Sequence, residues 1–184
     1  MAIVVDAGTL ATGTGTGNLA AQTPSLGGAT PQLVLFALGN NVGIGNDKNL
    51  AFGAATGVAE RACVVSSFGG GITTTATCHN LRTDAVLATY RGDETLDGVL
   101  DISAVGANSF TPAVDDAFGA SETVGWLAFA GLDGVSVGTL LLDADGPTGT
   151  DSVTGLSFQP DGVILFGYQA TVGTAAAGGE WSFG

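Results

Sequence analysis

The chain has 184 residues, of which 45% are hydrophobic and only 11% are charged. This length and composition exclude a disordered acidic tail, and they allow one well-buried core with an extension or two small domains. The net charge of −13 comes from 17 acidic residues against one lysine and three arginines, and it excludes nucleic-acid binding, which needs clustered basic side chains.

Two interpretations of this charge remain open. Carboxylates can simply keep an acidic protein soluble. Alternatively, the preference for Asp over Glu and the single lysine, Lys48, resemble haloarchaeal proteins, which work in molar salt where carboxylate repulsion is screened. No apolar run reaches the ~18 residues of a membrane helix, and residues 1–6 lack the pattern of a secretory signal. We therefore expect no membrane insertion.

Short apolar segments between clusters of Gly, Asn and Asp predict an all-β protein. The expected strands are 2–6, 32–38, 49–54, 61–68, 72–78, 84–90, 98–103, 108–113, 123–130, 135–142, 153–158 and 163–169. This spacing predicts an antiparallel, jelly-roll-like β-sandwich with a partial second repeat. Residues 11–30 and 40–48 are expected to be loops.

The segments 62–68 and 72–78 flank three glycines and predict a hairpin. A two-residue turn at Gly70-Gly71 would place Cys63 opposite Cys78. A cross-strand disulfide and two reduced, packed cysteines are both compatible with that register, although the pair would occupy a hydrogen-bonded position, where Cα atoms lie further apart.

Residues that could carry chemistry are few. His79 is the only histidine, and with Cys63 and Cys78 it matches no zinc signature. The carboxylates of Asp93, Glu94, Asp97 and Asp101 are most simply solvated turn residues. We therefore expect no catalytic residue, no enzymatic activity and no required cofactor.

One segment fits a cation better. Asp143, Asp145 and Asp151 place oxygen ligands around glycines that allow a sharp bend, which suits a divalent cation such as Ca²⁺. The loop departs from an EF-hand because Pro147 stands at its fifth position and no Glu stands at its twelfth. An ordinary acidic linker remains the alternative.

The chain also repeats itself at a shift of 130 positions. Residues 5–10 return as residues 135–140, and Leu33-Val34-Leu35-Phe36 returns as Val163-Ile164-Leu165-Phe166. We therefore expect a β-sandwich module at residues 1–131 and the start of a second, incomplete module at 132–184. The second part would continue beyond the chain, fold back on the first, or pair with a neighbouring subunit, because a half-module leaves strand edges and an apolar face uncovered.

The phrase Gly155-Leu156-Ser157-Phe158-Gln159-Pro160, followed by the apolar run 163–166, resembles a module that recurs in virion proteins of tailed viruses. The segments Phe52–Gly57 and Trp126–Gly131 resemble the later parts of that module. The resemblance spans about residues 26–184, but Gly27–Pro31 lacks the aromatic residue that precedes the proline elsewhere.

This resemblance implies a non-enzymatic structural protein on the virion surface, a capsid decoration or turret-like component, of a haloarchaeal virus. It implies a homo-oligomer, a trimer or pentamer, that contacts other virion proteins such as the major capsid protein. A receptor-binding or glycan-binding module of a tail fibre or spike is the alternative. The location in capsid or tail and the order of the oligomer stay open at this point.

Overall fold

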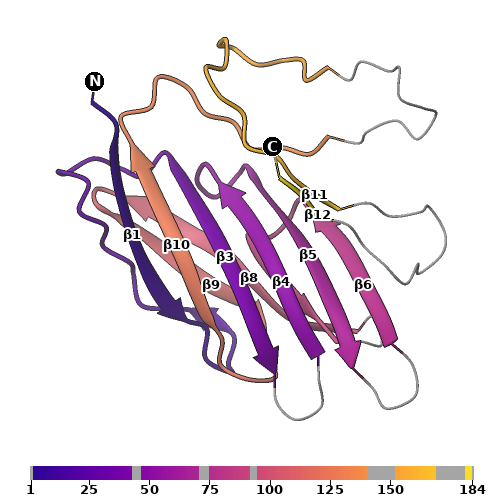
Figure 1. Cartoon of the computed structure of the whole chain (residues 1–184). Helices are drawn as coiled ribbons and strands as arrows, with labels where there is room; N and C mark the ends of the chain where they lie inside the picture. Colours follow the sequence, from indigo (N-terminus) through magenta and orange to yellow (C-terminus); the bar gives the residue numbers. More distant parts are fainter. Residues whose placement is uncertain are drawn as a thin grey trace.

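The computed structural model describes residues 2–42, 47–70, 75–91, 95–140, 152–168 and 181–183. These residues form antiparallel sheets that pack in two layers, so the predicted all-β sandwich is confirmed (Figure 1). The strands are β1 (Val4–Ala11), β2 (Gly17–Asn18), β3 (Leu33–Val42), β4 (Asp47–Ala55), β5 (Arg61–Gly70), β6 (Thr75–Arg82), β7 (Leu87–Tyr90), β8 (Leu96–Gly106), β9 (Ser109–Asp116), β10 (Thr123–Ala130), β11 (Phe166–Tyr168) and β12 (Trp181–Phe183).

One layer is a six-stranded sheet with the order β1-β10-β3-β4-β5-β6, and the other has the order β2-β9-β8-β7. Strands β3 to β6 follow one another up and down, as do β7 to β9. Strand β10 then returns to the first sheet and inserts between β1 and β3 (Figure 1). Strand β10, the last strand of the sandwich, therefore connects β1 to the rest of the first sheet.

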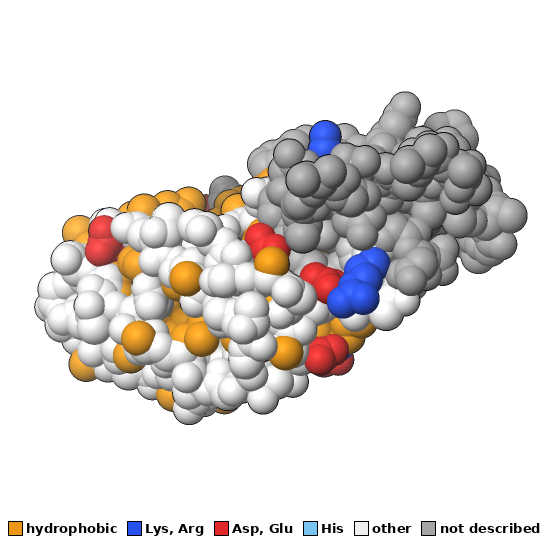
Figure 2. Space-filling view, turned by 90° about the horizontal axis from the view of Figure 1, so that it is seen from below, with side chains coloured by type: hydrophobic (Ala, Val, Ile, Leu, Met, Phe, Trp, Pro, Cys, Tyr) orange, Lys and Arg blue, Asp and Glu red, His pale blue; other side chains and the backbone are white. Residues whose placement is uncertain are grey.

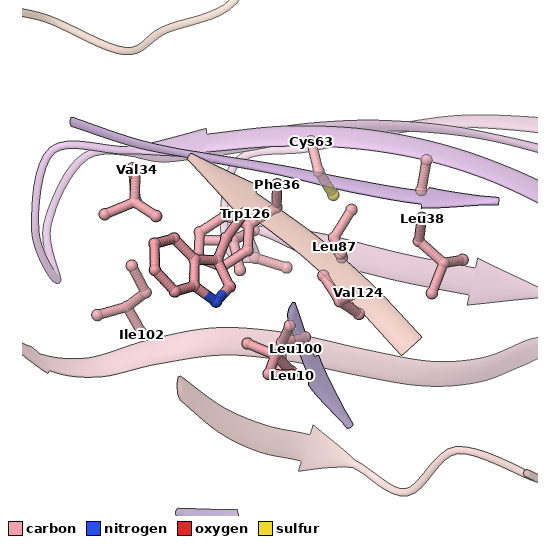
Figure 3. Packing of buried hydrophobic residues seen from close by; sticks show 14 of the residues in the cluster. Leu10, Val34, Phe36, Leu38, Cys63, Leu87, Leu100, Ile102, Val124 and Trp126 are labelled. Carbon is pink, nitrogen blue, oxygen red and sulfur yellow. The ribbon is translucent and has the colours of Figure 1, made fainter. Parts of the chain in front are cut away.

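The core lies between the two sheets and follows from the alternation of side chains along each strand. In β10 the residues Val124, Trp126, Ala128 and Ala130 are buried, and the residues between them are half-buried or exposed. Three aromatic rings fill the centre: Phe110 meets Phe36 and Trp126 edge to face, with ring centroids 5.9 and 5.3 Å apart. Figure 3 shows Phe36 and Trp126 among the aliphatic side chains that close this core.

The two layers lie very close together at Gly53 of β4. A Cβ atom added there would lie 1.7 Å from the carbonyl oxygen of Val86, which belongs to the connection that enters the second sheet. A real Cβ atom cannot occupy that space, so the contact between backbone and backbone requires glycine.

The hairpin β5–β6 has a different register from the predicted one. Strand β5 runs to Gly70 and β6 begins at Thr75, so the two strands are joined through four residues and not through a two-residue turn. Cys63 pairs with Arg82, and Cys78 pairs with Ser67. The expectation that the two cysteines face each other was wrong, because β6 begins only at Thr75 and each residue of β5 therefore pairs four positions further along the chain.

The part of the chain after β10 has less strand structure in its described residues than the sequence predicts. Strands were predicted at 135–142, 153–158 and 163–169. The described residues 135–140 and 153–158 have no strand structure, and of the described residues 163–168 only Phe166–Tyr168 forms one. Strands β11 and β12 nevertheless pair antiparallel, as β3 and β4 do, and they carry the repeated sequences. The repeat therefore returns one hairpin of the sandwich, and no second sandwich forms within the described residues.

Candidate functional site

The face of the six-stranded sheet that points away from the second layer is unusually apolar, and we call it the outer face. Its residues alternate with the core residues along each strand. From β1 to β6 its central part includes Val5, Ala7 and Thr9; Gly125, Leu127 and Phe129; Leu33, Leu35 and Ala37; Leu50, Phe52 and Ala54; Ala62, Val64 and Ser66; and His79 and Leu81.

The strand register lines these residues up in rows across the sheet. One row joins Ala7, Leu127, Leu35, Ala54 and Ala62. Neighbouring side chains in such a row lie in contact distance, so the row forms one continuous apolar strip. Both faces of the sheet can therefore bury hydrophobic surface, whereas a two-layer sandwich needs only one such face.

The chain itself covers one half of the outer face. Phe166 of β11 stacks on Phe52 of β4, with ring centroids 5.1 Å apart and an interplanar angle of 4°. Strand β11 also packs against β5, where the outer residues Val64 and Ser66 are buried. We call the outer residues of β4 and β5 the covered half.

The other half remains open to solvent. Val5 is 48% exposed and Leu127 is 41% exposed, and Ala7 and Ala37 are exposed as well. Leu33, Leu35 and Phe129 are half-buried between them. We call the outer residues of β1, β10 and β3 the uncovered half. None of the residues named for these three strands is charged.

Polar contacts hold the segment after β10 to one end of the sandwich. The side-chain amide of Gln32 donates to the carbonyl of Leu132 (2.9 Å) and accepts from its N–H (2.8 Å). Further on, the N–H of Val137 donates to the Glu60 carboxylate at 3.3 Å. These contacts lead the chain from β3 towards the β4–β5 turn, and they place β11 over the covered half.

The three arginines form ion pairs within the chain. Arg61 at the start of β5 pairs with Asp101 of β8, with Nε and Oδ2 2.9 Å apart, and this pair joins the two sheets. Arg82 binds Asp84 through two nitrogens, each 2.9 Å from a carboxylate oxygen, and Arg91 pairs with Asp97 at 2.9 Å. Figure 2, which views the molecule from below, shows basic side chains beside acidic ones on a largely uncharged surface. All three arginines thus bind carboxylates of their own chain.

Burial shifts two titrating groups of this region. The pKa of Asp101 is raised above its usual value by desolvation, which outweighs the opposing effects of the Ile102 N–H donor and of Arg61. The pKa of His79, on the outer face at β6, is lowered by desolvation. Asp101 was expected to be a solvated turn residue, and that expectation was wrong because β8 carries it between the sheets.

The predicted site residues have different outcomes. Cys63 is a free, buried thiol that stands opposite Arg82 and not opposite Cys78. Burial raises the pKa of this thiol to about 12. Asp143, Asp145 and Asp151 lie outside the described residues, so the cation site stays a prediction. Within the described part of the chain, no three His, Cys, Asp or Glu side chains come together as a metal site. Trp126 packs in the core.

The outer face itself was missed at the level of the sequence, although a signal for it existed. Leu33-Val34-Leu35-Phe36 and Val124–Ala130 are apolar on both sides of a strand, and such runs are typical of strands that are buried on both faces. The ion pairs gave no such signal, since Arg61 and Asp101 are far apart in the sequence.

No protein-family model, curated protein or solved structure matches this chain. None of the described segments forms a helix long and apolar enough to span a membrane.

Proposed function

We propose that the chain is a non-enzymatic structural protein of a virus-particle surface, a capsid decoration or turret-like component that assembles with further copies of itself. The observation that carries this proposal is the outer face. A stable two-layer sandwich does not need a second apolar face, and contiguous exposed apolar surface is typical of sites where proteins associate. The resemblance of residues 26–184 to virion modules supplies the viral setting.

The charge distribution supports association through this face. The chain carries a net charge of −13, so two copies repel each other wherever carboxylates approach. The uncovered half presents aliphatic and aromatic side chains and is the surface on which two copies can meet without that repulsion. Because salt screens the remaining charges, assembly should strengthen as the salt concentration rises.

The basic residues support a structural role as well. Arg61 and Asp101 connect β5 with β8, and Arg82 with Asp84 lies beside Tyr90, whose hydroxyl accepts from Asn80 at 2.7 Å. The Arg61 pair thus ties the two sheets together between β5 and β8, and Asn80 and Arg82 tie β6 to Tyr90 of β7. We expect these contacts to make the module rigid, as a component that is repeated over a particle surface needs to be.

The test uses an antibody that is raised against the purified chain. The antibody is applied to virus particles that are purified by density gradient from a culture that produces the chain. Electron microscopy is expected to show the antibody at regularly spaced positions on the particle surface. Detection of the chain only in the cellular fraction would contradict the proposal. Binding of the purified chain to a glycan array, with label confined to tail tips, would instead support the receptor-binding alternative.

A further inference from the structure

Residues 152–165, which we call the arm, precede β11 and have no strand structure. Three consecutive aliphatic side chains at the end of the arm are exposed: Val163 is 63% exposed, Ile164 is 57% exposed and Leu165 is 50% exposed. Three consecutive exposed aliphatic residues are costly in water, at about 25 cal/mol for each Å² of apolar surface. The arm is thus a second uncovered apolar surface in the same chain.

The sequence of the arm is suited to burial on both sides. Val163–Phe166 repeats Leu33–Phe36 at a shift of 130 positions. In the sandwich, Leu33–Phe36 forms part of β3 beside β10, where Val34 and Phe36 face the core and Leu33 and Leu35 face outward. The repeated segment therefore has the side chains of a strand that lies between two apolar layers.

Contacts within the chain show which kind of segment binds the outer face. Phe166 directly follows the arm, and its ring lies flat on Phe52 of the covered half. The occupant of that half is thus a short apolar strand of this same chain. The uncovered half continues the covered half along the strand rows, and it offers the same kind of side chains: Leu35 and Leu127 stand in one row with Ala54.

We infer that the arm of one copy binds the uncovered half of the outer face of a second copy. Within a single chain, Phe166 is seated on the covered half while Val163–Leu165 and the uncovered half both stay exposed, so a neighbouring copy satisfies both surfaces. Asp161 is the only charged residue of the arm, so the contact brings few carboxylates together. This inference rests on the proposed function, because it specifies how the copies assemble.

The contact joins two different surfaces, so it is heterologous. Such contacts form a ring when the rotation between neighbours closes, and a filament when it does not. A ring agrees with the trimer or pentamer that the resemblance implies. Two outer faces that met directly would instead give a twofold dimer and leave both arms exposed.

The test is disulfide trapping between two single variants, Leu127→Cys on the uncovered half and Ile164→Cys in the arm. Both carry Cys78→Ser, while Cys63 stays in place because its buried thiol is unreactive. The two proteins are mixed in equal amounts at high salt, oxidised mildly and analysed by intact mass. The expected result is a mixed dimer that exceeds either homodimer by about tenfold, because only the mixed pair brings an arm cysteine to an outer-face cysteine. A tenfold excess corresponds to a preference of about 1.4 kcal/mol for the mixed contact.

The matched control is Val105→Cys, which replaces an exposed aliphatic residue of β8 in the other sheet. Mixed with Ile164→Cys, it is expected to give no dimer above background. Predominant Leu127→Cys homodimers would overturn the inference in favour of direct face-to-face pairing. Absence of all cross-links, whether the chain is assembled or monomeric, would overturn it as well.

The two proposals fail separately. If the antibody labels virus particles and no mixed disulfide forms, the arm contact is wrong and the structural function stands. If the mixed disulfide forms and particles carry no chain, the contact is right and the viral function is wrong.

Discussion

Residues 33–36 and residues 163–166 have closely similar sequences and very different surroundings in one molecule. The first segment lies in β3 between β10 and β4, and its Phe36 is buried in the core. The second has only the short β11 and three exposed aliphatic residues. The difference shows that an apolar pattern determines what a segment can bury, whereas the presence of neighbouring strands determines whether it is buried.

The largest effect should come from the two equivalent phenylalanines. Phe36→Ala removes a buried ring that touches Phe110, and it should lower the free energy of unfolding by about 4 kcal/mol. Phe166→Ala removes one stacked pair on the outer face and should cost about 1 kcal/mol. Chemical denaturation monitored by tryptophan fluorescence measures both values, and equal losses would contradict the contrast between the two regions.

A pair of glycine variants sharpens the same comparison. Gly53→Ala forces a Cβ atom against the Val86 carbonyl and should cost about 3 kcal/mol, since overpacking displaces backbone. Gly138→Ala, in the segment after β10, meets no atom within 4 Å. It should change stability by less than about 0.5 kcal/mol. Thermal unfolding of the two variants checks this, and a tolerated Gly53→Ala would show that the layers are further apart.

The ion pair between the sheets should show a pH signature. Arg61→Ala leaves the Asp101 carboxylate buried without its cation, and for a pair that is only partly buried we expect a loss of about 2 kcal/mol at neutral pH. Burial already holds the folded-state pKa of Asp101 above its unfolded value. A buried carboxylate of this kind costs stability as the pH rises through that window, so the deficit of the variant should shrink as the pH falls and Asp101 is protonated.

Denaturation series at several pH values measure that trend. The double variant Arg61→Ala/Asp101→Asn is the control, and it should show neither the full loss nor the pH trend. A deficit that stays constant as the pH falls would mean that Asp101 does not carry the effect.

The smallest effect is expected at Arg91. Its side chain is 57% exposed, so its pair with Asp97 is well solvated. Arg91→Ala should lower the free energy of unfolding by less than about 1 kcal/mol, and this small effect should disappear in molar salt. Unfolding curves at low and high salt check this value, and a loss as large as that of Arg61→Ala would show that solvent exposure does not separate the two pairs.

The sequence was sufficient to predict the β-sandwich but not the register in which its strands pair. Alternation in segments such as 123–130 and 61–68 located real strands, because side-chain period is a local property. The register of β5–β6 failed because Gly69 and Gly70, which the sequence predicts as the turn region, belong to β5, and glycine by itself does not determine where a turn lies. The predictions at 135–140 and 153–158 failed for another reason: these segments have strand-like sequence, yet the described chain places no strand beside them to supply hydrogen-bond partners.

The most direct test of the assembly account is sedimentation velocity of the intact chain at high salt, compared with Leu127→Asp. This substitution places a carboxylate on the uncovered half at a side chain that is 41% exposed, so the sandwich itself should keep its stability. We expect the unmodified chain to sediment as a closed multimer and Leu127→Asp to sediment as a folded single chain. A monomeric unmodified chain at every salt concentration, or an equally large multimer for Leu127→Asp, would contradict the outer face as the surface of assembly.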